Sequence, residues 1–187
     1  DEVVAAADGT TVNWFMWGGA DTINTHVDEQ IGGPLLEQYN LTLNRVPLEN
    51  TADAVNKVLN EKAAGKNSGG SIDLIWINGE NFLNMKREAM LFGPFAESLP
   101  SFQYVDVAGK PTTRLDFSEP VEGMEAPWGM AQLTFFADRK RVPNPPRSMA
   151  ALLDFAKANP GRITYPRPPD FMGTTFLKQA LVELNAD

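Results

Sequence analysis

The chain has 187 residues, a formal net charge of −8, one His and no Cys. This length provides either one sizeable core or two small ones. The acidic balance disfavours nucleic acid and anionic membrane surfaces as partners, since both attract basic faces. No apolar run approaches the ~20 residues that cross a bilayer, so we expect no insertion into a membrane. Without Cys, and with a single His, thiolate chemistry and His-rich metal cages are excluded, so the composition favours binding over catalysis.

Strands and helices are predicted to alternate along the first two thirds of the chain, which is typical of an α/β fold with a largely parallel sheet. The predicted elements are a strand over 11–16, a turn at 17–19, a helix over 25–39, a strand over 41–46, a helix from its cap Thr51 to Gly65, a strand over 72–77 and a helix over 80–90. Pro34 is expected to start a second helical segment. The nearly all-apolar run over 72–77 is expected to be a central strand.

Residues 91–123 predict an irregular connection with short helical or strand pieces, because Pro and Gly interrupt them repeatedly. An extended segment over 124–137 follows, then a helix capped by Ser148, a short strand over 162–165 and a last helix that starts near Gly173. We therefore expect a first α/β lobe over 1–125, a hinge crossover over 126–137 and the start of a second lobe over 138–187. The final helical pattern stops without cap chemistry, so we expect the chain to be a fragment of a longer protein.

Two candidate binding segments follow predicted strands of the first lobe. Gly18 and its neighbour Gly19 let a ligand approach the backbone, and Trp17 offers a flat apolar or cation-accepting face. The alternative is a plain turn with Trp17 buried under the helix. Asn78 and Glu80 begin the helix after the third strand, where Glu80 favours a cation or hydroxyl groups. The alternative there is N-capping by Asn78 or Asn81.

Two further candidates lie in the hinge and in the second lobe. Trp128 and Gln132 are expected to face a ligand from the floor of an inter-lobe cleft, and the alternative is a buried strand with a Gly bulge. Tyr165, Gly173 and Thr174 flank a helix start that suits an anion or a polar ligand. The alternative for this last group is N-capping by Thr174.

Other chemistry-bearing residues have plainer interpretations. His26 is interpreted as a surface or capping residue, since one His makes no metal site alone. Three glutamates near the crossover are interpreted as a solvated loop: Glu119, Glu122 and Glu125. Motifs for phosphate-binding loops, dinucleotide binding and nucleophilic serines are absent from the sequence.

The candidate segments together resemble the bacterial extracellular solute-binding proteins of ABC transporters, in particular the YnjB-like subfamily. The segments that carry the resemblance are Trp17-Gly18-Gly19, Ile77-Asn78-Gly79-Glu80-Asn81-Phe82, Pro127-Trp128-Gly129-Met130-Ala131-Gln132-Leu133-Thr134-Phe135 and Thr164-Tyr165-Pro166-Arg167-Pro168-Pro169-Asp170-Phe171-Met172-Gly173-Thr174. The resemblance covers about residues 10–187. Members of the family are about twice this long, so it implies a chain that stops just inside the second lobe.

The resemblance implies a type II periplasmic-binding fold, in which two α/β lobes joined by an extended hinge close on a solute. It also implies a periplasmic or lipid-anchored receptor that delivers the solute to a membrane permease. We expect a monomer with no cofactor, no metal site and no catalytic residues. The cleft residues implied are Trp17, Gly18, Asn78, Glu80, Trp128, Gln132, Tyr165, Gly173 and Thr174.

The aromatic and acidic residues among these positions favour a small organic cation, thiamine-like or polyamine-like, held partly by cation–π contact. Receptors for an anion, iron or a sugar are alternatives. Another alternative is a carboxylate-dependent enzyme on the same scaffold, with Glu80 and Asp170 as its acid/base pair.

Overall fold

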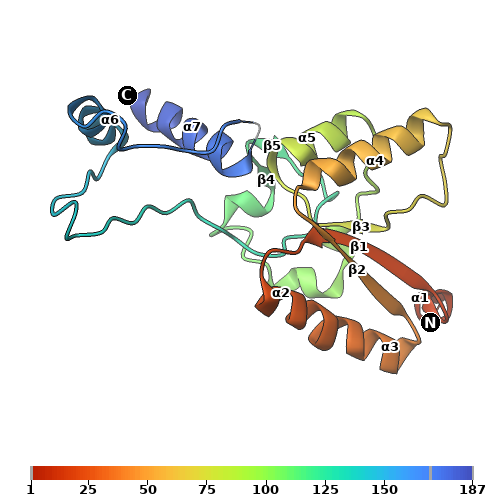
Figure 1. Ribbon diagram of the computed structural model, residues 1–187. Coiled ribbons are helices and arrows are strands. Elements are labelled where there is room, and N and C mark those ends of the chain that lie inside the picture. The colour runs from red at the N-terminus through yellow and green to blue at the C-terminus, as the bar shows by residue number, and fades with distance from the viewer. Residues whose placement is uncertain (1, 169, 187) are drawn as a thin grey trace. The chain divides into compact units, whose positions relative to one another are not determined.

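A computed structural model describes residues 2–168 and 170–186 of the chain (Figure 1). Pro169 of the Tyr165–Thr174 segment and the two terminal residues lie outside this description. The chain divides into two compact units, Asp1–Pro127 and Trp128–Asp187. Helices combine with a parallel sheet, so the predicted mixed α/β class is confirmed.

A parallel sheet forms the centre of the first unit. Among the described residues it consists of β1 (Thr11–Trp17), β2 (Thr42–Leu48) and β3 (Leu74–Ile75), in the order β2-β1-β3. The prediction that 72–77 forms a central strand is wrong, since β1 is central and β3 is a two-residue edge strand. Leu74 is accordingly 42% exposed.

β2 runs through Pro47 to Leu48, although the sequence predicts a strand that ends at Val46. Proline lacks an N–H group and therefore removes one donor from a ladder. An edge strand tolerates this loss, because one of its sides needs no partner within the sheet. β2 lies at such an edge.

One face of the sheet packs against a helical layer of three consecutive segments (Figure 1): α2 (Asp21–Thr25), the π-helix η1 (His26–Gly32) and α3 (Gly33–Tyr39). Trp14 and Met16 point from β1 to the same side and form a core cluster with Val27 of η1. The layer begins four residues before the predicted start at Thr25. Pro34 lies in the first turn of α3, which confirms the prediction that it starts a second helical segment.

The other face of the sheet carries α4 (Thr51–Ala63) and α5 (Gly79–Arg87) (Figure 1). α5 begins one residue before the predicted start and buries Phe82. The predicted cap of α4, Thr51, is wrong: Asn50 is the N-cap, and its side-chain oxygen accepts a 3.0 Å hydrogen bond from the backbone N–H of Ala52. Of the apolar positions on α4, Ala54 and Val55 are buried, whereas Leu59 is 41% exposed.

Short elements complete the first unit. A short helix, α1 (Glu2–Ala7), precedes the sheet in a stretch for which the sequence makes no prediction. The predicted irregular connection over 91–123 is confirmed. It contains the 3₁₀ turns η2 (Ala96–Ser98), η3 (Pro100–Tyr104) and η4 (Pro111–Thr113), and an antiparallel pair of β4 (Leu115–Asp116) and β5 (Glu119–Pro120).

The second unit contains α6 (Met149–Ala158) and α7 (Phe171–Leu184). Ser148 caps α6 as predicted, since its Oγ accepts a hydrogen bond from Ala151 N at 3.1 Å. The side chain of Glu183 on α7 accepts a 2.7 Å hydrogen bond from Met149 N and so ties the two helices together. The predicted strand over 162–165 is wrong, and residues 126–137 also carry neither helix nor strand.

Candidate functional site

The carboxyl ends of β1 and β3 bring two predicted segments to one edge of the sheet. Phe15 lies opposite Ile75, and the pairing extends one residue further because Trp76 N donates to Phe15 O at 2.9 Å. The same offset places Gly18 and Asn78 at this edge. In open parallel sheets, ligands bind outside the carboxyl ends of the strands.

Trp17 lies at the end of β1 with its indole ring folded against the following turn. The ring is 45% exposed, so the alternative of a Trp buried under the helix is wrong. A Cβ atom on Gly19 would lie 2.3 Å from Cζ2 of Trp17. Any other residue at position 19 would clash with the ring in this position. The half-exposed ring remains available to a ligand.

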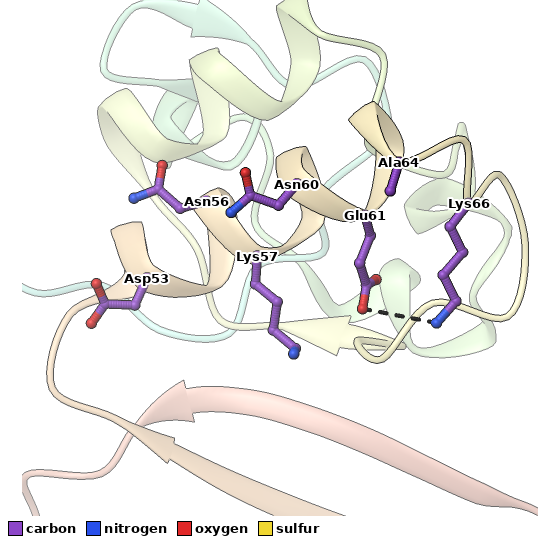
Figure 2. A pocket seen from close by; sticks show the side chains of 7 residues that line it. All are labelled: Asp53, Asn56, Lys57, Asn60, Glu61, Ala64 and Lys66. Atoms are coloured by element: carbon purple, nitrogen blue, oxygen red, sulfur yellow. Dashed lines mark ion pairs between the residues drawn. The ribbon is translucent and has the colours of Figure 1, made fainter.

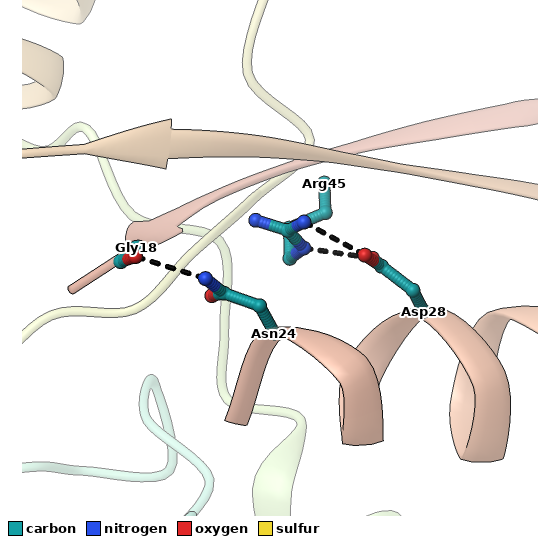
Figure 3. A network of polar contacts seen from close by, with 4 residues as sticks. All are labelled: Gly18, Asn24, Asp28 and Arg45. Carbon is teal, nitrogen blue, oxygen red and sulfur yellow. Dashed lines mark hydrogen bonds and ion pairs between the residues drawn. The ribbon is translucent and has the colours of Figure 1, made fainter. Parts of the chain in front are cut away.

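Gly18 is held by its neighbours on both sides. Its N–H donates to Leu48 O at 3.2 Å. Its carbonyl accepts a 2.9 Å hydrogen bond from Nδ2 of Asn24 on α2 (Figure 3). A Cβ atom on Gly18 would lie 2.6 Å from Cβ of Pro47. The backbone after β1 is thus fixed in place, and Asn24, which the sequence analysis did not single out, is the side chain that fixes it.

The start of α5 is occupied by a carboxylate from β4. Asn78 is the N-cap residue, but its side chain makes no capping hydrogen bond, and Asn81 lies inside the helix. Gly79, with φ of +60°, donates its N–H to the carboxylate of Asp116. Glu80 is exposed in the first turn. The positive end of this helix therefore already faces a negative charge of the protein itself.

The interpretation of the three crossover glutamates as a solvated loop needs correction. Lys86 on α5 contacts Glu119 at 2.8 Å and Glu122 at 3.2 Å, and its ammonium also donates to Pro120 O at 2.5 Å. The hydrogen bond with Glu119, followed by that with Glu122, raises the pKa of Lys86 above its usual range. Two of the three glutamates thus join α5 to the β5 region.

Glu125 stands apart from this ion-pair network. Burial raises the pKa of its carboxyl group to about 8, and repulsion from Asp116 adds to the shift. The sequence pattern groups Glu125 with Glu119 and Glu122. The spacing of these residues does not reveal that Lys86 contacts Glu119 and Glu122. It also does not reveal that Asp116 is the charged group that acts on Glu125.

In the second unit, the start of α7 packs against the segment that contains Tyr165. A Cβ atom on Gly173 would lie 1.9 Å from the carbonyl oxygen of Pro166, so only glycine fits there. The N-cap of α7 is Asp170, whose Oδ1 accepts a 3.0 Å hydrogen bond from Gly173 N. The alternative that Thr174 caps this helix is therefore wrong. Thr174 is half-buried in the first turns of α7.

Tyr165 also lines an apolar pocket of about 360 Å³ within the second unit. Its ring lies 5.0 Å from that of Phe176, which in turn meets Phe135 edge-on at 6.0 Å. The pocket is lined by Leu133, Phe135, Leu152, Arg162, Ile163, Thr164, Tyr165, Pro166, Met172 and Phe176. Trp128 and Gln132 are outside this lining and are exposed, so the alternative of a buried strand is wrong for them.

A second concave surface, of about 520 Å³, runs along the outer side of α4 (Figure 2). Most of the residues that line it have polar side chains, and none is a predicted site residue; the lining is Asp53, Asn56, Lys57, Asn60, Glu61, Ala64 and Lys66. The Ser71 hydroxyl donates to Glu61 at 2.7 Å, which lowers the pKa of that carboxyl group. Glu61 is thus engaged in joining α4 to the loop after it.

Residues 2–168 and 170–186 contain no group of three or more His, Asp or Glu side chains with the arrangement of a metal site. No helix in the same residues combines the length and apolarity that a membrane crossing requires.

Comparison with known protein families identifies the family of this chain. A family model described as bacterial extracellular solute-binding protein matches residues 31–187. The chain belongs to this family. Its similarity to ABC transporter solute-binding proteins, which the sequence motifs indicated, is thereby confirmed.

A particular relative extends the match to the whole chain. Over 186 residues, the chain is 48% identical to Protein YnjB of Escherichia coli (strain K12). The match covers 100% of this chain and 47% of that protein. The chain therefore spans about half the length of the curated relative that it matches.

Proposed function

We propose that the protein is the solute-binding receptor of an ABC import system. Two α/β lobes, joined by a hinge over 126–137, would close on a small solute, and the closed form would present it to a membrane permease. The receptor acts as a monomer outside the cytoplasm, in the periplasm or on a lipid anchor. Ligand stabilises the closed form because it touches both lobes. Family membership supports this assignment.

The ligand we propose is a small organic cation, thiamine-like or polyamine-like. The observation that carries this choice is the contact between Gly79 N at the start of α5 and the carboxylate of Asp116. A helix N-terminus normally attracts anions, but this one is already met by a carboxylate. The half-exposed ring of Trp17 lies at the end of the neighbouring strand and suits a cation–π contact.

The first lobe contributes Trp17, Gly18, Asn78 and Glu80 to the proposed cleft. Gly18 is held on both sides and Glu80 is exposed in the first turn of α5. Because the Gly18 backbone is already fixed and the Glu80 carboxylate is exposed, little reorganisation is needed when a cation binds.

The hinge contributes Trp128 and Gln132, and the second lobe contributes Tyr165, Gly173 and Thr174. Asp170 occupies the start of α7 just as Asp116 occupies that of α5. Both helix starts that resemble anion cradles in sequence therefore carry a carboxylate of the protein. This parallel favours a cation over an anion.

The enzyme alternative would use Asp170 as one of its two acid/base groups. The Asp170 carboxylate accepts the Gly173 N–H and serves as the cap of α7.

A thermal-shift screen of the full-length protein tests the proposal, with organic cations, organic anions and neutral sugars at equal concentrations. We expect organic cations to raise the melting temperature, because binding to the folded state stabilises it. A response to anions or sugars, with none to cations, would contradict the ligand class. Chemical change of the responding compound would contradict the receptor assignment.

A further inference from the structure

The charge of the chain is divided unevenly between its two units. Residues 128–187 hold eight basic and five acidic side chains, whereas residues 1–127 hold eight basic and nineteen acidic ones. The first unit is therefore strongly acidic, and the second is basic. Exposed charges are screened beyond about 8 Å at physiological ionic strength, so the local charge decides what a surface attracts. The acidic balance of the whole chain thus does not argue against an anionic partner for the second unit.

Three consecutive basic residues of the second unit lie on one turn, named here the basic turn: Arg139, Lys140 and Arg141. Asp138 holds this turn in place. Its carbonyl oxygen accepts backbone hydrogen bonds from Arg141 N at 3.0 Å and from Val142 N at 2.8 Å, and its Oδ1 accepts one from Lys140 N at 2.9 Å. The turn is thus folded before a partner arrives, so little conformational entropy is lost on binding.

All three basic side chains of the turn are exposed. Arg141 contacts Asp138 at 3.6 Å, yet its side chain remains 86% exposed. Within residues 2–168 and 170–186, Arg139 and Lys140 form no ion pair. The turn therefore presents positive charge that the described part of the chain compensates only at Arg141.

An exposed aromatic side chain precedes the basic turn. Phe136 is 94% exposed, whereas its neighbour Phe135 lines the apolar pocket of the same unit and meets Phe176 there. Basic side chains next to an exposed aromatic ring are typical of surfaces that bind lipid headgroups, because the ring enters the boundary with the acyl chains. An acidic protein surface would match the charges, but it would need a shaped apolar recess for the Phe136 ring. A lipid surface accepts such a ring without one.

We propose that the basic turn and Phe136 bind the headgroups of anionic phospholipids at a membrane surface. The Arg and Lys side chains pair with headgroup phosphates, and the Phe136 ring enters the layer beneath them. The contact is peripheral and reversible, since a few basic residues and one ring contribute far less than a membrane-spanning helix. If the proposed function holds, the contact keeps the receptor at the membrane that contains its permease; the lipid binding itself does not depend on that function.

Flotation of the full-length protein with lipid vesicles tests this proposal. The vesicles contain phosphatidylcholine alone or phosphatidylcholine mixed with phosphatidylglycerol, and we expect binding only to the anionic mixture. Raising NaCl from about 0.1 M to about 1 M shortens the Debye length from about 10 Å to about 3 Å, so it should release the protein. Arg139→Gln combined with Lys140→Gln should weaken binding about tenfold or more, since each basic residue near an anionic surface contributes about fivefold. Phe136→Ala should weaken binding while its salt dependence remains.

Lys57→Gln combined with Lys66→Gln is the matched control. It removes the same charge from the concave surface on α4 and should leave vesicle binding unchanged. Equal losses in the two double variants would overturn the proposal, because total charge would then account for the binding. Equal binding to neutral vesicles would overturn it as well.

The absence of vesicle binding would also overturn the proposal. Retention on immobilised polyglutamate in that case, lost in the Arg139→Gln, Lys140→Gln variant, would assign the basic turn to an acidic protein partner instead. The thermal-shift response to organic cations is measured without lipid, so the membrane contact and the proposed function fail separately.

Discussion

The guanidinium of Arg45 on β2 donates two hydrogen bonds of 2.7 Å to the carboxylate of Asp28 in the π-helical segment η1. The same helical layer carries Asn24, which holds the Gly18 carbonyl (Figure 3). The ion pair therefore joins the sheet to the layer that positions the turn after β1. π-Helical segments are uncommon and frequently lie at functional sites.

Replacing Asp28 by Asn is expected to lower the free energy of unfolding by about 0.5–1 kcal/mol at neutral pH, because the pair is bidentate but partly exposed. The hydrogen bond from Arg45 lowers the pKa of Asp28. The contribution is therefore present above the ordinary value of 3.8 and is lost as the pH falls through the lowered pKa. Urea unfolding of both proteins at several pH values measures it.

Asp154→Asn provides the control for this prediction. Asp154 faces Lys157 at 3.7 Å, with side chains that are 79% and 68% exposed, so its loss should change little. Equal effects of the two substitutions would mean that the Arg45–Asp28 pair stabilises the protein no more than the exposed Lys157–Asp154 pair does.

Gly18→Ala is expected to destabilise the protein by about 1–3 kcal/mol, as overpacking does. The added methyl group would lie 2.6 Å from Cβ of Pro47. Gly32→Ala is the matched control, since the nearest atom to its Cβ would be 3.5 Å away, an ordinary contact, and alanine favours a helix. Urea midpoints that fall for Gly32→Ala and not for Gly18→Ala would contradict the packing of this turn.

The cap of α4 can be tested by two adjacent substitutions. Asn50→Ala removes the acceptor of the Ala52 N–H and should cost about 1 kcal/mol of unfolding free energy. Thr51→Ala should cost less, because Thr51 lies inside the helix and alanine has the higher helix propensity. Thermal unfolding of both variants compares them, and the reverse ranking would restore Thr51 as the cap.

Trp128→Ala is expected to weaken solute binding by about 1–3 kcal/mol, as the loss of a stacked aromatic would. Phe136→Ala is the control, since Phe136 follows in the same extended stretch, is 94% exposed and is not a predicted site residue. Calorimetric titration of the full-length variants measures both affinities. Unchanged binding by Trp128→Ala would remove this residue from the cleft.

Local chemistry made some elements of the fold predictable. Ser148 as the cap of α6 and Pro34 at the start of α3 follow from side-chain capping and from the missing N–H of proline. Strands are predicted over the apolar run 72–77 and over the segment 162–165. Of these residues, only Leu74 and Ile75 form a strand. A strand needs hydrogen-bond partners distant in sequence, and local patterns do not reveal them.

The placement of Gly18 and Asn78 at one edge of the sheet was predictable from the sequence. The register of β1 and β3 brings Gly18 and Asn78 to one edge, as the positions of their strands in the sequence indicate. Asn24, Asp116 and the separate environment of Glu125 were not predictable. Each depends on a contact between elements, such as the Asp116 carboxylate with Gly79 N, whose partners lie 37 positions apart.

Native mass spectrometry of the full-length protein with the solute that co-purifies with it tests the proposed receptor role most directly. We expect a single small organic cation, released chemically unchanged on denaturation and bound again by the emptied protein. A co-purified anion or sugar would contradict the proposed ligand class. Conversion of the released compound by the protein would contradict its role as a binding receptor.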